Sequence, residues 1–329
     1  MKHLLIIFSL LLASVSWSKD VNYTDLVKRD GLWYEKFTNE PFTGNSTGLK
    51  QGKVKEGKKD GVWLYYSVNG QLYLKNTYKV GKKDGERLKY YDNGQLKEKG
   101  NYKDGKKIDE WLEYYENNQL KIKRNYKDGK LEGESLWHHK NGQLESKGNY
   151  KDDEKEGEWL HYRSNGKLWR KYYYKEGKKI GEWLEYYENG KLYRNGNYKD
   201  GKRNGLKTDW HKNGRKESEG NWKNDKQEGL LTAWYENGQK RTEIYYKNGK
   251  KEELQTRWYE NGQKRSEVNY KNGKQDGLVT EWHKNGQKRF EGNWVDGKVD
   301  GVVTFWDKEG EVTKTDTYKD GKLVEVIKL

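Results

Sequence analysis

The chain has 329 residues, of which 36% are charged and 31% are hydrophobic, and its formal net charge at pH 7 is +15. With 15 Trp and 27 Tyr but only 5 Phe, it is too polar for an ordinary aliphatic core of this length and too rich in aromatic residues for a disordered chain. The lack of Cys excludes disulfides, thiolate chemistry and a cysteine-linked lipid anchor. We therefore expect a fold that buries locally packed aromatic rings.

The first 18 residues have the pattern of a secretory signal peptide. Lys2 and His3 precede an apolar run at 4–13, and the small residues Ser16 and Ser18 precede a predicted cut before Lys19. The apolar run is shorter than the roughly 20 residues of a membrane span, so we expect a mature chain without a transmembrane segment. This predicts export to the periplasm, the cell surface or the extracellular space; an uncleaved amino-terminal anchor is the other interpretation.

Residues 19–56 precede the repeats and are interpreted as an N-terminal capping region. They contain Pro41, the only proline, which suits the edge of a sheet because it cannot donate a backbone hydrogen bond.

An internal repeat dominates the remaining chain. Asn-Gly or a close relative returns every 24 residues without insertion or deletion, and two further glycine columns share this period. The octapeptide WYENGQKR at 234–241 recurs unchanged at 258–265. About eleven units occupy residues 57–321. The asparagines of the first column are Asn69, Asn93, Asn117, Asn141, Asn165, Asn189, Asn213, Asn237, Asn261 and Asn285.

Each unit is typical of a β-hairpin. Asn-Gly suits a two-residue turn with positive φ, and short segments rich in Tyr, Trp, Thr and Leu flank it. A connector of the Asp-Gly-Lys-Lys-Asp-Gly type then leads into the next unit. The sequence therefore predicts an all-β protein: an elongated, twisted, single-layer array of antiparallel β-hairpins with a 24-residue repeat.

Two aromatic columns accompany the repeat, and we expect their rings to stack along the array in place of a conventional core. One runs from Tyr66 to Trp306 and the other from Tyr78 to Tyr318, both with the 24-residue period. Two residues before the first column, Leu occupies the first six units and Thr the last five, and Trp replaces Tyr in the first column at the same boundary. This exchange at near-constant volume indicates that the two positions share a face.

The exchange divides the array into two subarrays. The Leu/Tyr subarray covers 57–204 and the Thr/Trp subarray covers 205–322, with a predicted final strand at 323–329. The Leu/Tyr subarray carries lysines such as Lys171 on its returning strands, where the Thr/Trp subarray carries glutamates such as Glu243.

The Thr/Trp subarray contains the candidate binding residues. If Asn-Gly forms a simple two-residue turn, each arginine of its returning strands lies directly across from a tryptophan, in a ladder of cation–π pairs worth ~0.5–1 kcal/mol each. A one-residue bulge would instead move the arginines to the other face. The candidates are Trp234, Trp258, Trp282, Arg241, Arg265 and Arg289.

These motifs carry a family resemblance. The pattern Tyr-x-x-Gly-Lys-x-x-Gly-x-Trp at 174–183, followed by Tyr-Tyr-x-Asn-Gly-x-Leu, resembles the bacterial variant of the MORN repeat. The stretch at 31–44 is similar to the leader that precedes the repeats in such proteins, which often bear the label of toxin–antitoxin system antitoxins. The sequence lacks the His-Gly-x-Gly element of the usual motif. The resemblance implies an elongated antiparallel sheet with no enzymatic role.

No residue pattern indicates catalysis, a metal site or a cofactor. The histidines after the signal occupy positions of the repeat, as do the many carboxylates, and there is no phosphate-binding loop or dinucleotide fingerprint.

Two function classes remain open. One is a scaffold for protein–protein interaction, including an antitoxin-like or immunity-like role. The other is a binder of anionic glycans, lipid headgroups or other cell-envelope polymers through aromatic faces and lysine-rich edges. Export argues against nucleic acid as a partner.

Overall fold

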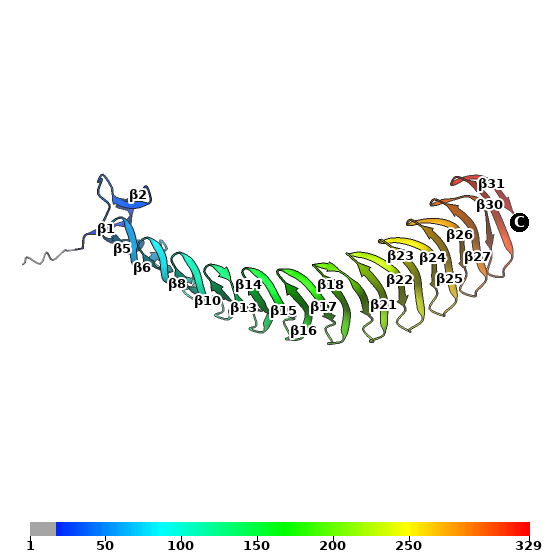
Figure 1. The fold of residues 1–329 in the computed structure, drawn as a ribbon, viewed down its shortest axis with the longest axis horizontal. Helices are drawn as coiled ribbons and strands as arrows, with labels where there is room; N and C mark the ends of the chain where they lie inside the picture. Colours follow the sequence, from blue (N-terminus) through cyan, green and yellow to red (C-terminus); the bar gives the residue numbers. More distant parts are fainter. Residues whose placement is uncertain (1–17) are drawn as a thin grey trace, which may run out of the picture. The chain divides into compact units, whose positions relative to one another are not determined.

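The computed structural model describes residues 18–329, so the predicted signal peptide lies outside the described residues except for Ser18. The chain divides into two compact units, one ending at Glu132 and one spanning Gly133–Leu329. In both units the strands form antiparallel hairpins that follow one another in chain order (Figure 1). The prediction of an all-β array of antiparallel hairpins is confirmed.

The first unit begins with the predicted capping region. There β1 pairs in parallel with β4, β2 pairs with β3 in a separate two-stranded sheet, and Tyr34 forms an isolated bridge with Pro41. The repeating hairpins follow from β5. The elements are β1 (Asp20–Asn22), the 3-10 helix η1 (Tyr23–Asp25), β2 (Leu26–Arg29), β3 (Leu32–Glu35), β4 (Gly44–Thr47), β5 (Lys50–Lys55), β6 (Lys58–Tyr66), β7 (Leu72–Lys79), β8 (Lys82–Tyr90), β9 (Leu96–Lys103), β10 (Lys106–Tyr114), β11 (Leu120–Lys127) and β12 (Lys130–Leu131).

The second unit continues the alternation of outgoing and returning strands. Its strands are β13 (Gly133–His138), β14 (Leu144–Lys151), β15 (Glu154–Tyr162), β16 (Leu168–Lys175), β17 (Lys178–Tyr186), β18 (Leu192–Lys199), β19 (Lys202–Arg203), β20 (Gly205–Trp210), β21 (Lys216–Lys223), β22 (Lys226–Trp234), β23 (Lys240–Lys247), β24 (Lys250–Trp258), β25 (Lys264–Lys271), β26 (Lys274–Trp282), β27 (Lys288–Val295), β28 (Lys298–Val299), β29 (Gly301–Trp306), β30 (Val312–Lys319) and β31 (Lys322–Lys328).

The two-residue turns lie at the connectors between units, not at the Asn-Gly column. Between β23 and β24, Asn248 and Gly249 have φ of 52° and 81°, and Lys247 pairs directly with Lys250. Positive φ at both central residues is the signature of the turn that matches strand twist. The Asn-Gly turn is longer: the Tyr235 amide donates to the Gln239 carbonyl, the Gly238 amide donates to the Tyr235 carbonyl, and only Gly238 of the Asn237–Gly238 pair has positive φ. The predicted two-residue turn at Asn-Gly is therefore wrong.

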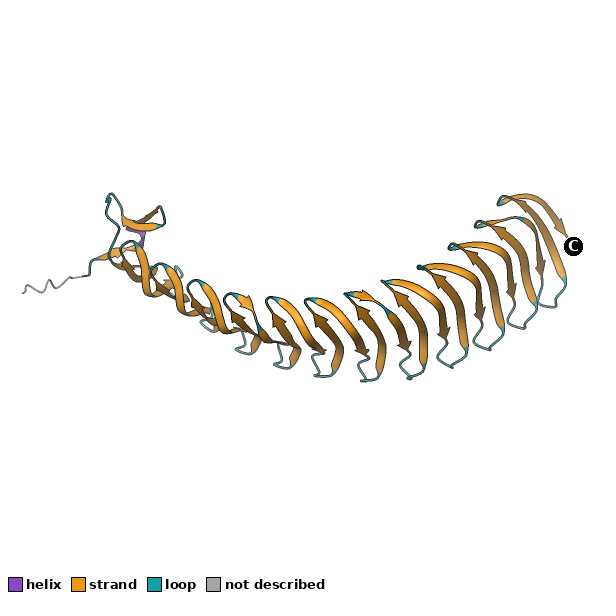
Figure 2. Ribbon diagram, in the orientation of Figure 1, coloured by secondary structure: helices purple, strands orange, loops and turns teal. Residues whose placement is uncertain are grey.

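The third glycine column marks a β-bulge in each outgoing strand. Gly229 has a φ of 78°, which favours glycine, and the register of β22 against β21 shifts between the pairs Leu231–Gly220 and Glu228–Asn221. Bulges bend strands, and the strands of both units are strongly curved (Figure 2).

The core lies on one face of the sheet, which we call the inner face. Trp159, Tyr172 and Trp183 are buried there, and Tyr150, Tyr174 and Tyr198 pack against them. Each indole needs a small neighbour on an adjacent strand: a Cβ added to Gly148 would lie 2.3 Å from the Trp159 ring, and one added to Gly196 would lie 2.7 Å from Nε1 of Trp183. Glycine in these strands is therefore explained by close approach.

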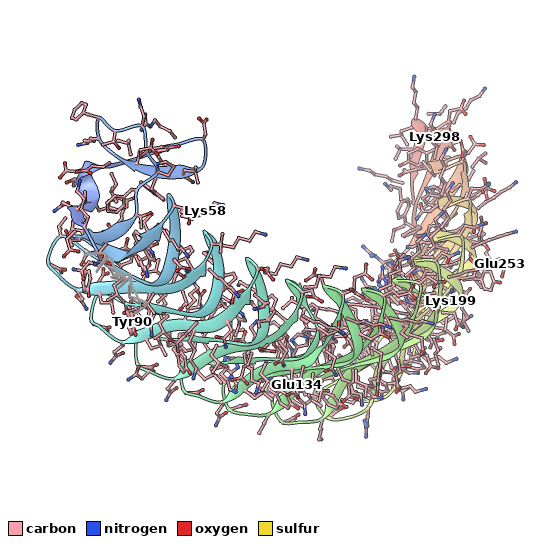
Figure 3. The ribbon with its side chains drawn as sticks, turned by 60° about the vertical axis from the view of Figure 1, so that its left-hand side comes forward. Lys58, Tyr90, Glu134, Lys199, Glu253 and Lys298 are labelled. Carbon is pink, nitrogen blue, oxygen red and sulfur yellow. The ribbon has the colours of Figure 1, made fainter. Side chains whose placement is uncertain are left out.

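The opposite, outer face carries the first predicted aromatic column, because side chains alternate along a strand. Ile244 is buried on the inner face with Tyr246 two residues later, whereas Thr232 and Trp234 lie on the other side of the sheet. Side chains project from both faces (Figure 3). The two predicted aromatic columns therefore lie on opposite faces of the sheet, the second of them with the core rings on the inner face, and Thr and Trp share the outer face, as predicted.

Candidate functional site

The candidate residues lie at the Asn-Gly ends of successive hairpins in the second unit. Trp234, Trp258 and Trp282 end the outgoing strands β22, β24 and β26, where their side chains are half-buried. Arg241, Arg265 and Arg289 are the exposed second residues of the returning strands β23, β25 and β27.

The structure does not place these arginines across from the tryptophans. Trp234 pairs with Lys240, and the preceding pair is Ala233 with Thr242, so that Arg241 is the extra residue of a bulge. The same shift leaves Arg265 and Arg289 unpaired in register. The predicted arginine–tryptophan ladder is wrong because the longer Asn-Gly turn changes the register by one residue. Instead, Arg289 Nη1 lies 3.1 Å from Glu281 Oε2.

Lysines contact the tryptophans in their place, and they do so between neighbouring units. Lys240 Nζ lies 5.8 Å from the ring centroid of Trp258, and Lys264 Nζ lies 5.8 Å from that of Trp282. Each lysine also pairs with a glutamate three residues later, Lys240 with Glu243 at 2.6 Å and Lys264 with Glu267 at 2.5 Å. The outer face of the Thr/Trp subarray is therefore lined by charge-compensated lysines beside indole rings.

The predicted threonine column is tied to the same glutamates. Thr280 lies opposite Glu291, and its Oγ1 donates to Glu291 Oε2 at 3.0 Å. The hydrogen bond from Lys288 is the main reason why the pKa of Glu291 lies below its usual range. The polar groups of Thr280 and Glu291 thus bond to side chains of the sheet itself.

The histidines of the repeat join neighbouring units. His211 Nε2 lies 3.0 Å from the Trp234 carbonyl and His283 Nε2 lies 3.1 Å from the Trp306 carbonyl, each 23 residues later. Tyr235 and Tyr259 donate equivalent hydrogen bonds to the carbonyls of Trp258 and Trp282 at 2.8 Å. The same position thus has a structural role whether it holds His or Tyr, as the repeat pattern predicts.

An exposed aliphatic column on the outer face was missed by the sequence analysis. It occupies the position after the third glycine column in the Thr/Trp subarray, where the five side chains are 44–55% exposed. The Leu/Tyr subarray has glutamate there in five consecutive units, at Glu86, Glu110, Glu134, Glu158 and Glu182. We call the five exposed residues the aliphatic column: Leu206, Leu230, Leu254, Leu278 and Val302.

Polar side chains of the returning strands accompany this column. Leu206 pairs with Asn221, Leu230 with Tyr245, Leu254 with Asn269, and Leu278 with Asn293. Because side chains alternate, the residues two positions further along β21, β23 and β25 share this face. These are the exposed lysines Lys223, Lys247 and Lys271, whereas the equivalent residue of β27 is the exposed Val295.

The repeats match a known protein-family model. The MORN repeat variant model matches residues 83–104, 110–128, 131–152, 155–176, 179–200, 227–248, 254–272 and 275–296, which together make up more than half of the chain. The chain belongs to the MORN repeat variant family. Each matched MORN segment covers most of one 24-residue period.

Several solved structures match this chain over small parts of much longer chains. A Photorhabdus luminescens Tc holotoxin pore is 15% identical with a TM-score of 0.19, over 85% of this MORN chain and 17% of that chain. A TcdB2-TccC3 structure is 14% identical with a TM-score of 0.18, over 82% of this chain and 18% of that one. The MORN chain thus spans less than a fifth of the length of each of these two chains. No curated protein matches it.

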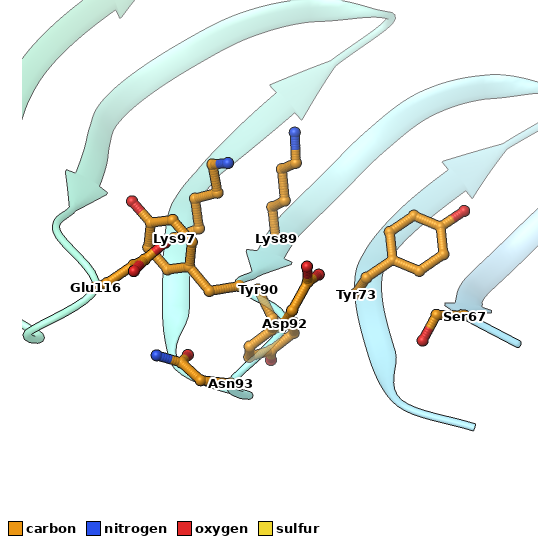
Figure 4. A pocket seen from close by; sticks show the side chains of 9 residues that line it. Ser67, Tyr73, Lys89, Tyr90, Asp92, Asn93, Lys97 and Glu116 are labelled. Carbon is orange, nitrogen blue, oxygen red and sulfur yellow. The ribbon is translucent and has the colours of Figure 1, made fainter. Parts of the chain in front are cut away.

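Shallow hollows recur between the Asn-Gly ends of the MORN hairpins. One of about 490 Å³ is lined by Tyr73, Tyr90, Tyr91 and Glu116 (Figure 4). Tyr91 is engaged there, because it donates to the Tyr114 carbonyl at 2.8 Å and lies 4.8 Å below Lys97 Nζ. A hollow at Tyr187 repeats this position four periods later. These hollows therefore arise from the repeat geometry.

Within residues 18–329, no three potential metal-ligating side chains gather into a site. The same residues include no helix with the length and apolarity needed to cross a membrane.

Lysines on the inner face of the MORN repeats lie over the core rings. Lys59 Nζ lies 3.9 Å from the Trp63 ring centroid and donates to Tyr65 Oη at 2.8 Å. Burial lowers the pKa of Lys59 from its ordinary 10.5 to about 8, and repulsion by Lys50 and Lys28 adds to the effect.

This shift predicts a rise in stability with pH. Between the two pKa values the unfolded state binds more protons than the folded state, so the free energy of unfolding increases there; below the folded value the full cost of burying the charge is present. Urea denaturation at pH 7 and at about pH 9.5 should show this rise in the wild type and a smaller rise in Lys59→Met. An identical pH dependence in the two proteins would contradict it.

Proposed function

We propose that the chain is a non-enzymatic, exported repeat scaffold that binds a partner protein through the outer face of its Thr/Trp subarray. The aliphatic column is the observation that supports this proposal. Exposed apolar side chains are ordinary when they are scattered, whereas a regular row of them on one face of a soluble protein indicates an interaction surface. Here five such side chains recur in consecutive units.

The contrast between the subarrays supports the same proposal. The fold does not require an aliphatic residue at this position, because five units of the Leu/Tyr subarray have glutamate there. Three of those glutamates form ion pairs: Glu86 with Lys75 at 2.8 Å, Glu110 with Lys123 at 2.5 Å, and Glu158 with Lys171. Glutamate at this position therefore suits an outer face in contact with solvent. Leucine or valine there suits an outer face that a partner covers.

The predicted signal peptide supports the location proposed for this scaffold, the periplasm or the cell surface. An antitoxin-like role is one form that binding of a partner protein would take, with neutralisation of a toxin as its readout.

The lysine pairs at the connectors favour a second candidate, the binding of an anionic cell-envelope polymer. Lys223 lies directly opposite Lys226, and Lys247 directly opposite Lys250. Like charges at directly opposed positions destabilise a sheet, so their recurrence is unfavourable for the isolated fold. An anionic chain along these turns would relieve the repulsion.

A set of substitutions distinguishes the two candidates. The column variant gives the aliphatic column the residue of the Leu/Tyr subarray, and a control variant changes the corresponding glutamates of that subarray. The column variant carries Leu206→Glu, Leu230→Glu, Leu254→Glu, Leu278→Glu and Val302→Glu. The control variant carries Glu86→Gln, Glu110→Gln, Glu134→Gln, Glu158→Gln and Glu182→Gln.

Residues 19–329 of each protein would be used to capture soluble proteins of the source organism at physiological salt. Binding of the captured protein, once purified, would be measured by calorimetry. We expect the control variant to retain the partner and the column variant to lose it while keeping its circular dichroism spectrum. Retention of only acidic polymers, lost as salt rises, would favour the second candidate. Equal binding of one protein by both variants would contradict the proposed surface.

A further inference from the structure

We propose that the aliphatic column binds an extended segment of polyproline-II type, with an apolar side chain at every third residue and acidic residues between. This inference rests on the proposed scaffold function and specifies the chemistry of its partner. Three features of the column support it: its spacing, its hydrogen-bonding neighbours and its charge.

The spacing of the column matches this conformation. Neighbouring strands lie about 4.8 Å apart, so residues in consecutive two-stranded units are separated by about 9.6 Å. A polyproline-II helix has three residues per turn and rises about 9.3 Å in one turn, so every third side chain points the same way. Over the four intervals of the column the mismatch reaches only about 1 Å.

Other regular conformations fit this spacing less well. A helix with one apolar residue in seven advances about 10.5 Å per repeat and is out of step by more than 3 Å over the same four intervals. An extended β-strand places same-face side chains about 6.7 Å apart, so three of its intervals, about 20 Å, span two units and its side chains meet only every second residue of the column. The spacing therefore selects a three-residue period.

Hydrogen-bond donors stand beside the apolar side chains. Asn221 and Asn293 are exposed and lie directly opposite Leu206 and Leu278, and Tyr245 lies opposite Leu230 with 38% of its surface exposed. A polyproline-II chain makes no internal hydrogen bonds, so its carbonyls are free to accept from such side chains. In these three units an amide or hydroxyl donor meets one carbonyl per turn of the ligand, whereas Asn269, opposite Leu254, already donates to the Leu278 carbonyl at 2.8 Å.

The charge beside the column indicates the acidic residues. Lys223, Lys247 and Lys271 are exposed, and they follow the donor position by two residues on the same face. The Thr/Trp subarray also has uncharged turns between its lysines, at Asn248-Gly249 and Asn272-Gly273. A ligand with one carboxylate per three residues would place its charges along this lysine row.

A synthetic peptide tests the inference directly. The probe is Leu-Pro-Glu repeated five times and labelled for fluorescence anisotropy. Comparison peptides replace Glu by Lys, replace Leu by Gly, or lengthen the period to four residues as Leu-Pro-Pro-Glu. Binding is measured with residues 19–329 of the wild type, the column variant and the control variant, after circular dichroism has shown the same fold in all three.

We expect the Leu-Pro-Glu peptide to bind the wild type and the control variant with equal affinity. The column variant should bind it at least ~10-fold more weakly, since the apolar contacts are lost and carboxylates face carboxylates. The three comparison peptides should also bind at least ~10-fold more weakly, because each removes one matched feature.

Equal affinity for the three-residue and four-residue periods, or for the wild type and the column variant, would overturn the inference. Failure of the peptide to bind would also overturn it. In that case the protein-capture experiment decides separately: if the column variant still loses its protein partner, the scaffold function stands and only the form of the ligand is wrong. If the column variant binds both the peptide and the protein partner as tightly as the wild type does, both proposals fail.

Discussion

Gly148→Val should destabilise the protein by about 3 kcal/mol, because the inner face has no room for a side chain at this position. A Cβ at Gly148 would lie 2.3 Å from Cδ2 and Cε2 of Trp159, closer than any real contact. Trp159 is 1% exposed and packs on Trp137 and Tyr150, so it has no space to move away. Chemical denaturation followed by tryptophan fluorescence and circular dichroism measures the loss.

The double variant Gly148→Val/Trp159→Val is the matched test of this explanation. In the Thr/Trp subarray the equivalent positions are Val268 and Val279, which lie opposite each other and are 7% and 3% exposed. The repeat thus accepts either a large and a small residue or two of middle size. We expect the double variant to be more stable than Gly148→Val alone. If Trp159→Val lowers the stability of the Gly148→Val protein further, the steric clash between residues 148 and 159 is not the cause of the destabilisation.

Deleting residues 241–264 should leave a folded protein with a similar melting temperature. The deletion joins Lys240 to Arg265 and restores the sequence WYENGQKR, so one returning and one outgoing strand are removed and every later strand keeps its direction. In repeat proteins stability is a sum over units and their interfaces, so loss of one internal unit has a modest cost.

Deleting only residues 241–252 should have a far larger effect. It removes all of the returning strand β23 except Lys240, its connector, and the first three residues of β24, and the rest of β24 would then have to pair in the opposite direction. We expect aggregation or loss of cooperative unfolding, measured by size-exclusion chromatography and thermal denaturation. Similar behaviour of the two deletions would show that the 24-residue unit is not the structural unit.

The hairpin array and its period follow from the sequence because glycine and asparagine positions constrain the backbone locally. The kind of turn does not follow so directly. Both Asn237-Gly238 and Asn248-Gly249 suit a two-residue turn, yet only the second forms one. At Asn237, Oδ1 accepts from the Gln239 amide and Nδ2 donates to the Glu260 carbonyl of the next unit. Contacts between units therefore decide the turn.

The contacts of the candidate site likewise depend on turn and bulge geometry that the sequence pattern does not specify. The tryptophans are in the predicted strands. The bulge at Arg241, however, places Lys240 instead of the arginine opposite Trp234, and Lys240 lies over Trp258 of the neighbouring unit. The inner face also could not be assigned by simple alternation, because the bulge at Gly229 adds a residue within each outgoing strand. Leu230 follows that glycine, so the face on which it lies depends on the register of β22 against its neighbouring strands.

A lysine-acylation footprint tests most directly whether the outer face of the Thr/Trp subarray is the binding surface. The wild type would be acylated with and without its purified protein partner, and each lysine read by mass spectrometry. We predict strong protection of Lys223, Lys247 and Lys271, which accompany the aliphatic column, and unchanged labelling of Lys75, Lys99 and Lys147 in the Leu/Tyr subarray. Protection of the second group with full labelling of the first would contradict the account.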